Sequence, residues 1–170
     1  MPINPPPLLG LRWAIKRSFL DYIERSPGGR GSLADGAVAT ADREIVFAPD
    51  ARSSASTPDN GRTLAFRGTA TFIAYSGALL VPIANPEVRL EGTKGELTVV
   101  DPFHPGSTAR LRFASFAIDD HLLAEGFEHW AASDVRLASE GCALFNNVYP
   151  DATPLEPLTI IVRGPTNTAD

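Results

Sequence analysis

Two hydroxyl side chains, Ser18 and Tyr22, fall one helical turn apart in the segment GLRWAIKRSFLDYIE, which begins at Gly10. At about 100° per residue they share one stripe with two aliphatic residues. A proline run before the segment and Pro27-Gly28-Gly29 after it limit its length. We therefore predict a long N-terminal helix over Leu11–Glu24, with both hydroxyls facing inward. A buried phenol needs a hydrogen-bond partner, so Tyr22 either bonds a backbone carbonyl in the core or belongs to a binding site.

Other residues that could do chemistry are scattered. His104, His121 and His129 share no metal-site spacing, and we expect His104 on a surface loop. Cys142 is interpreted as an apolar filler in a short helix. The chain lacks a Gly-x-Ser-x-Gly nucleophile elbow, and Asp119-Asp120 before His121 is interpreted as a solvated turn. We predict that the protein is not an enzyme, and a small hydrolase is the weakest of the alternatives.

Length and charge exclude several classes of protein. The 170 residues indicate one domain over 1–170, with flexible tails at 1–9 and 164–170. A net charge of -5 and scattered basic residues argue against nucleic-acid binding. There is no apolar run of membrane-spanning length and no signal-peptide pattern. If Met1 is the native start, we expect a cytoplasmic protein; otherwise we expect a secreted or cell-surface one.

Short alternating segments dominate the rest of the chain. In Arg62–Tyr75 the residues Leu64, Phe66, Ala70 and Phe72 point one way, and a bulge or bend is expected at Gly68. Glycines mark Ser26–Gly36 as a connector, and Asn60-Gly61 is a hairpin signal. Turn signals every ten or so residues favour a mainly β fold, an antiparallel β-sandwich or partly closed barrel. The expected strands are Glu44–Ala48, Arg62–Tyr75, Ala78–Ile83, Val88–Glu91, Glu96–Val100, Ala109–Ile118, Phe127–Ala132 and Leu158–Arg163, with a short helix at Ser139–Phe145.

The order of these segments resembles the HtaA domain, a haem-binding module of bacterial haem uptake. Three stretches are similar to the family's opening helix, its central hairpin and its closing L-T-x-x-G…F…Y…L-D-P-L-T motif. Together they span nearly the whole chain in the family's order. They are Leu11-Arg12-Trp13 with Ser18-Phe19 and Tyr22-Ile23; Phe66-Arg67-Gly68 through Ser76-Gly77-Ala78-Leu79, Ile83-Ala84-Asn85-Pro86 and Val88-Arg89-Leu90; and Leu137, Gly141, Phe145 and Tyr149 before Leu155-Glu156-Pro157-Leu158-Thr159.

The resemblance implies an antiparallel β fold that holds ferric haem (ferric protoporphyrin IX) through a tyrosine of the first helix. Tyr22 occupies that position. Ser18 and Tyr149 match residues that contact haem propionates, and Phe19 belongs to the same motif and is counted with the cofactor-binding residues. Two alternatives stay open: Ser18 bonds back to the carbonyl of Ala14, or Tyr149 is an ordinary half-buried loop residue.

This chain departs from the family at two site positions. Tyr75 stands where the family has a histidine that hydrogen-bonds the ligand tyrosine, and it could donate to the Tyr22 oxygen or merely fill space between strands. Val148 replaces a phenylalanine that stacks on the porphyrin, a loss of about 0.5–1.5 kcal/mol. Keeping the ligand phenol ionised at neutral pH costs about 4 kcal/mol, which the iron must largely supply.

These observations lead to two competing functions. The first is a protein that binds ferric haem through a tyrosinate, for haem uptake, buffering or transfer to another haem carrier or acceptor protein, as a monomer or homodimer. The second is an HtaA-like fold that has lost haem and serves as a binding module for another apolar ligand or as a protein-interaction domain. The changes at Tyr75 and Val148 motivate the second.

Overall fold

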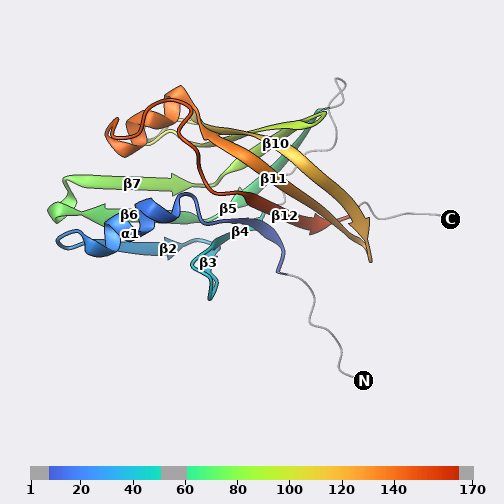
Figure 1. Ribbon diagram of the computed structural model, residues 1–170, viewed down its shortest axis with the longest axis horizontal. Coiled ribbons are helices and arrows are strands. Elements are labelled where there is room, and N and C mark those ends of the chain that lie inside the picture. The colour runs from blue at the N-terminus through green and yellow to red at the C-terminus, as the bar shows by residue number, and fades with distance from the viewer. Residues whose placement is uncertain (1–7, 51–60, 165–170) are drawn as a thin grey trace.

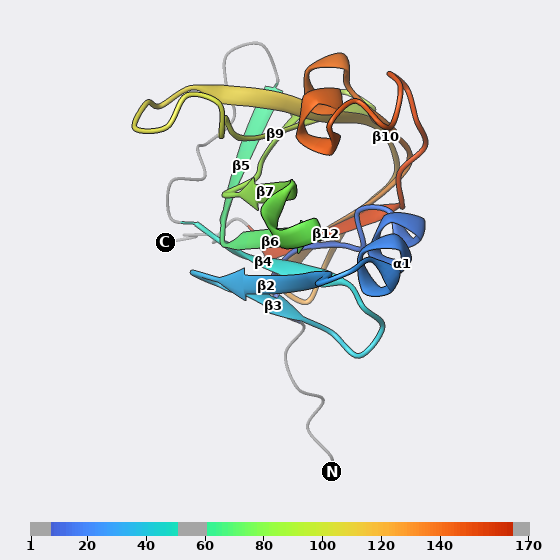
Figure 2. The same ribbon diagram turned by 90° about the vertical axis from the view of Figure 1, so that its left-hand side faces the viewer.

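Eight antiparallel strands close into a barrel, seen from the side in Figure 1 and towards one end in Figure 2. The computed structural model describes residues 8–50 and 61–164, so most of the expected tails and Asn60 of the expected hairpin lie outside it. Around the barrel the order is β1-β12-β11-β10-β9-β8-β5-β4, and β4 pairs back with β1. The strands are β1 (Gly10–Trp13), β4 (Ile45–Pro49), β5 (Gly61–Arg67), β8 (Glu87–Glu91), β9 (Lys94–Val100), β10 (Arg110–Ala124), β11 (Phe127–Leu137) and β12 (Leu158–Arg163).

The expectation of a mainly antiparallel β fold is confirmed, but the sandwich is wrong and the barrel is fully closed. Closure depends on β1, which pairs with β12 on one edge and with β4 on the other. A further short strand, β3 (Ala37–Ala39), extends the sheet beyond β4. In the part of the chain that the structure describes, no helix has the length and apolar character needed to cross a membrane.

A smaller three-stranded sheet, with strand order β2-β6-β7, projects from one end of the barrel (Figure 1). Its strands are β2 (Arg30–Ala34), β6 (Thr69–Ala74) and β7 (Leu79–Ala84). Gly68 divides the predicted strand Arg62–Tyr75 into β5 of the barrel and β6 of this sheet. Its φ is +130°, and a Cβ there would lie 2.6 Å from the backbone nitrogen of Ala37. The expected bend at Gly68 is therefore confirmed, because glycine fits both this backbone conformation and this close approach.

The predicted long N-terminal helix is wrong. Its first residues form β1, whose Leu11 and Trp13 side chains both face the core, with the period of two that a strand requires. Ile15 has a left-handed φ of 64°, so the helix cannot begin before it. The helix α1 (Arg17–Arg25) then has only 9 residues.

Three other expectations need correction, and several are confirmed. Strand β10 runs through Asp119-Asp120, expected as a turn, because pairing with β11 continues to Ala124. Strand β2 lies inside the expected connector Ser26–Gly36. Strand β11 runs five residues beyond the predicted end at Ala132, to Leu137. The last strand and the short helix η2 (Ser139–Phe145) have the predicted bounds.

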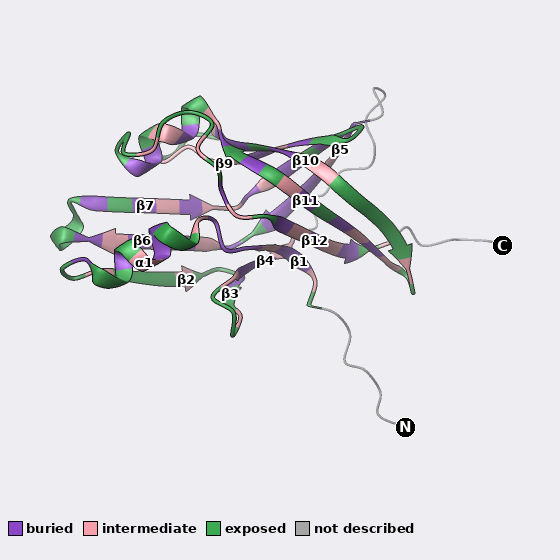
Figure 3. Cartoon of the chain, in the orientation of Figure 1, coloured by how far each residue is buried: buried purple, intermediate pink, exposed green. Residues whose placement is uncertain are grey.

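An unbroken series of aromatic contacts links the barrel core to α1 and the small sheet. Neighbouring ring centroids lie 5.0 to 5.8 Å apart. Figure 3 shows buried residues running through the barrel strands and onto α1, β6 and η2. Three of these contacts are edge-on and one, between Phe113 and Phe145, is tilted; the contact between Phe19 and Phe145 fixes α1 and η2 against each other at one end of the barrel. The series is Trp13, Phe113, Phe145, Phe19 and Phe72.

Candidate functional site

A cavity of about 260 Å³ opens where α1, the start of β7 and the end of η2 meet. Five of the six predicted site residues line it, and Ser18 does not. Sequence reasoning missed four lining residues, although three of them, Ala78, Leu79 and Phe145, lie in the motifs that carried the resemblance. The lining residues are Phe19, Tyr22, Tyr75, Ala78, Leu79, Phe145, Asn146, Val148 and Tyr149.

The phenols of Tyr22 and Tyr75 meet at this cavity. The Tyr22 hydroxyl donates a hydrogen bond to the Tyr75 hydroxyl oxygen at 3.1 Å, and the two side chains remain 40% and 44% exposed. Tyr75 begins the 3-10 turn η1 (Tyr75–Gly77) in a left-handed conformation, and its backbone N–H donates to the carbonyl of Pro27, just beyond α1. Of the two alternatives for Tyr22, the one in which it is a core residue bonded to a backbone carbonyl is therefore wrong, because its hydroxyl bonds another phenol.

This hydrogen bond separates the acidities of the two phenols. Because Tyr22 donates its proton to Tyr75, the bond raises the pKa of Tyr22, and partial desolvation adds to the rise. The same bond stabilises a negative charge on Tyr75 and lowers the pKa of Tyr75, with a smaller contribution from the Ser26 hydroxyl. Without a bound cation, Tyr75 is thus the phenol that ionises more easily.

The floor of the cavity is aromatic and its rim is partly open. Phe19 is buried, and Tyr149 packs edge-on against Phe145 with a centroid separation of 5.3 Å. Burial raises the pKa of Tyr149, so this phenol keeps its proton at neutral pH. Val148 lies at the rim and is 70% exposed. A flat apolar ligand could rest against the floor while part of it stays in solvent.

Ser18 lies on the exposed side of α1, which corrects its predicted inward position. The buried face of the helix consists of Phe19, Leu20 and Ile23. Within the described residues Ser18 makes no side-chain hydrogen bond, including to the carbonyl of Ala14, which precedes the helix. The predicted position of Ser18 was wrong because a strand, a left-handed residue and a helix were treated as one continuous helix.

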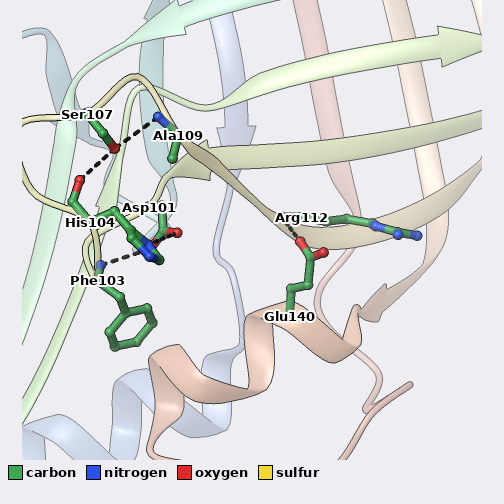
Figure 4. A network of polar contacts seen from close by, with 7 residues as sticks. All are labelled: Asp101, Phe103, His104, Ser107, Ala109, Arg112 and Glu140. Atoms are coloured by element: carbon green, nitrogen blue, oxygen red, sulfur yellow. Dashed lines mark hydrogen bonds and ion pairs between the residues drawn. The ribbon is translucent and has the colours of Figure 1, made fainter.

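The histidines lie outside this cavity. Figure 4 shows His104 turned towards Asp101 in the loop between β9 and β10, where its Nδ1 lies 2.8 Å from Asp101 Oδ2, as expected for a surface loop. His121 stacks on Trp130 with centroids 4.6 Å apart. Among the described residues, no group of three His, Cys, Asp or Glu side chains could hold a metal ion. Cys142 is half-buried and packs against the core.

A larger open groove of about 630 Å³ lies along β8 to β11. Four of its charged side chains form ion pairs, Arg112 with Glu96 at 3.1 Å and Arg136 with Asp134 at 2.7 Å. Its lining contains no tyrosine and only one aromatic residue, Phe116. We therefore place the candidate site in the smaller cavity.

Comparison with solved structures identifies the same fold in proteins of Corynebacterium glutamicum. The C-terminal domain of HtaA is 23% identical, with a TM-score of 0.76 over 90% of this chain and 94% of that one. A domain-swapped dimer variant of that domain is 21% identical, with a TM-score of 0.68 over 97% and 99%. The haem-binding protein HtaB is 18% identical, with a TM-score of 0.62 over 90% and 91%.

Comparison at the level of sequence gives the family. No curated protein matches the chain. The family model HtaA, described as "Htaa", matches residues 9–161, which cover most of the 170 residues. The resemblance drawn from the three sequence motifs is thereby confirmed: the chain belongs to the HtaA family.

Proposed function

We propose that this protein binds ferric haem at the cavity between α1 and η2, with the Tyr22 phenolate as the iron ligand. The observation that carries the proposal is the pair of phenol oxygens, 3.1 Å apart, at the mouth of an aromatic cavity. Membership of the HtaA family supports it, as does the haem-binding relative with the same fold. Haem uptake, buffering or transfer to a carrier or acceptor protein is the use that we propose.

The residues present fit the chemistry of ferric haem. Phenolate is a hard anionic ligand of the kind that holds ferric iron in some haem proteins. The aromatic floor suits a porphyrin face, and the cavity volume of about 260 Å³ with an open rim would cover the porphyrin only in part. We propose that Phe19 forms part of that floor, that Val148 covers the ring edge, and that Ser18 and Tyr149 contact the propionates.

Tyr75 has a defined role in this proposal. When Tyr22 gives up its proton, the Tyr75 hydroxyl can rotate and donate to the Tyr22 oxygen, so the hydrogen bond reverses without moving either ring. Because its phenol oxygen lies only 3.1 Å from that of Tyr22, Tyr75 is the alternative iron ligand. The two single phenylalanine variants distinguish these assignments, since each keeps the ring and removes one oxygen.

The test is a titration of the parent, Tyr22→Phe and Tyr75→Phe with ferric haem, followed by visible absorption. We expect Tyr22→Phe to lose the tyrosinate spectrum and most of the affinity. We expect Tyr75→Phe to keep the spectrum and to lose haem about fivefold faster, for a hydrogen bond worth about 1 kcal/mol. An unchanged spectrum and affinity in Tyr22→Phe would exclude Tyr22 as the ligand, and the reverse pattern would assign the iron to Tyr75.

The second candidate function is binding of an apolar ligand without iron. The exposed Val148 and the phenol at position 75 favour it, because both lie where the family has residues that secure haem. Metal-free protoporphyrin IX separates the two functions, since it offers the same ring without the iron. Equal affinity for the metal-free and ferric forms would favour the apolar-ligand function, whereas we expect clear preference for the ferric form.

A further inference from the structure

The outer part of the hairpin formed by β10 and β11 has one edge without a partner strand. Strand β9 pairs with β10 only as far as Ala117, and the carbonyl of Thr93 accepts a further bond from the N–H of Ile118. On the other side of β10, pairing with β11 continues to Ala124. Figure 1 shows this hairpin reaching the end of the barrel opposite α1. Among the described residues, no strand pairs with residues 119–124 on the β9 side, and we call this segment the free edge.

The turn of the hairpin determines which backbone groups of the free edge point outward. The two turn residues, Glu125 and Gly126, have φ values of 55° and 83°, as in a type I′ turn. Such a turn joins Ala124 to the first residue of β11 by hydrogen bonds. Because bonded and non-bonded pairs alternate along an antiparallel ladder, the backbone of Leu123 does not bond β11. The N–H and C=O groups of Leu123, and of His121 two residues earlier, therefore point towards the free edge.

The side chains of the free edge and its turn are acidic and apolar. Asp119, Asp120 and Glu125 are exposed, and they form no ion pair within the part of the chain that the structure describes. Leu122 and Leu123 are 53% and 59% exposed, and they lie on opposite faces of the strand because successive side chains alternate. A strand that pairs here can therefore cover a leucine on each face and place positive charges beside the acids.

We infer that the free edge binds an extended segment of another protein, in which basic and apolar side chains alternate. Main-chain hydrogen bonds to His121 and Leu123 hold this segment as an added strand. The three acids favour a positively charged partner. A second copy of this chain fits less well, because pairing two free edges would bring acidic side chains opposite each other. The inference does not depend on haem binding.

The experiment follows the backbone amides of the isotopically labelled parent by NMR while a short peptide of alternating lysine and valine is added. We expect the amide signals of His121 and Leu123 to shift most and their hydrogen exchange to slow. A glutamate–valine peptide of the same length should bind about tenfold more weakly, because it meets like charges. A lysine–proline peptide of the same charge cannot pair as a strand, so it should leave exchange at these two amides unchanged.

Three variants separate main-chain pairing from charge. Leu123→Pro removes an outward N–H and should abolish binding, whereas Leu123→Ala keeps that N–H and should retain most of it. Asp119→Asn combined with Asp120→Asn should weaken binding of the lysine–valine peptide about fivefold, and this variant tests the inference even if the proline variant unfolds. Equal binding of the two valine peptides, or amide shifts centred elsewhere, would refute the inference. A dimer in sedimentation that Leu123→Pro disrupts would assign the free edge to a second copy of this chain, contrary to the inference.

Discussion

Replacement of Glu128 by glutamine should destabilise the barrel more than any change of a surface ion pair. Its side chain is 9% exposed, and one oxygen lies 2.6 Å from Arg62 Nη1 on β5, a strand on the far side of the barrel from β11. The other oxygen lies 2.7 Å from His121 Nε2. Arg62 also covers the Trp130 ring at 5.2 Å. The carboxylate thus joins three strands across the barrel interior.

The expected loss follows from these contacts. Breaking a buried ion pair costs about 3–5 kcal/mol, because one charge stays behind without its partner. The Arg62 side chain is 32% exposed and can recover some hydration, so we expect the lower end, about 3 kcal/mol. Urea unfolding of the parent and Glu128→Gln at neutral pH measures the free energy of unfolding directly.

The matched control is Asp134→Asn, which breaks the exposed pair with Arg136 and should cost less than about 1 kcal/mol. A double-mutant cycle with Arg62→Met isolates the interaction between the two side chains. A loss in Glu128→Gln no larger than that in Asp134→Asn would refute the reasoning.

Three more changes give defined outcomes. Gly68→Ala should lower the free energy of unfolding by about 2 kcal/mol or more in urea, because its φ of +130° and the 2.6 Å approach to Ala37 exclude a Cβ. A hydrogen bond from the backbone N–H of Phe103 and a weaker one from His104 lower the pKa of Asp101. The ionised Asp101 therefore stabilises the fold above about pH 4, and this stabilisation is lost as the pH falls through the folded pKa. Asp101→Asn should make the free energy of unfolding less dependent on pH in this acidic range. Tyr75→His should slow the loss of ferric haem about fivefold, measured with a haem acceptor, and equal rates would contradict the proposed role of position 75.

Alternating apolar residues made much of the sheet predictable. Leu64, Phe66, Ala70 and Phe72 are all buried, as their period of two indicated. The closure of the barrel was not predictable in this way. It depends on β1 pairing with β12, which is more than 140 residues away along the chain, and no local pattern encodes which two strands meet.

The N-terminal segment Leu11–Glu24 shows why the prediction of one long helix failed. Leu11 and Trp13 satisfy the period of a strand, yet Leu11 also fits a helical stripe with Ile15 when the segment is read as one element. A left-handed φ at an isoleucine is unfavourable and leaves no signal in the sequence. Family motifs located Tyr22 and Tyr75 where periodicity could not, because the motifs carry information on how distant segments meet.

The residue at which α1 begins also determines the position of Tyr22 in the site. Had α1 begun at Leu11, its inward stripe would have buried Tyr22 in the core, beyond reach of a ligand. The helix instead begins at Arg17. Its buried positions are then taken by Phe19 and Ile23, and Tyr22 lies at the cavity, where its hydroxyl bonds that of Tyr75. The left-handed conformation of Ile15, which ends β1 and precedes α1, therefore helps to determine that the Tyr22 side chain faces the cavity. A metal-binding role for Tyr22 depends on that break as much as on the phenol.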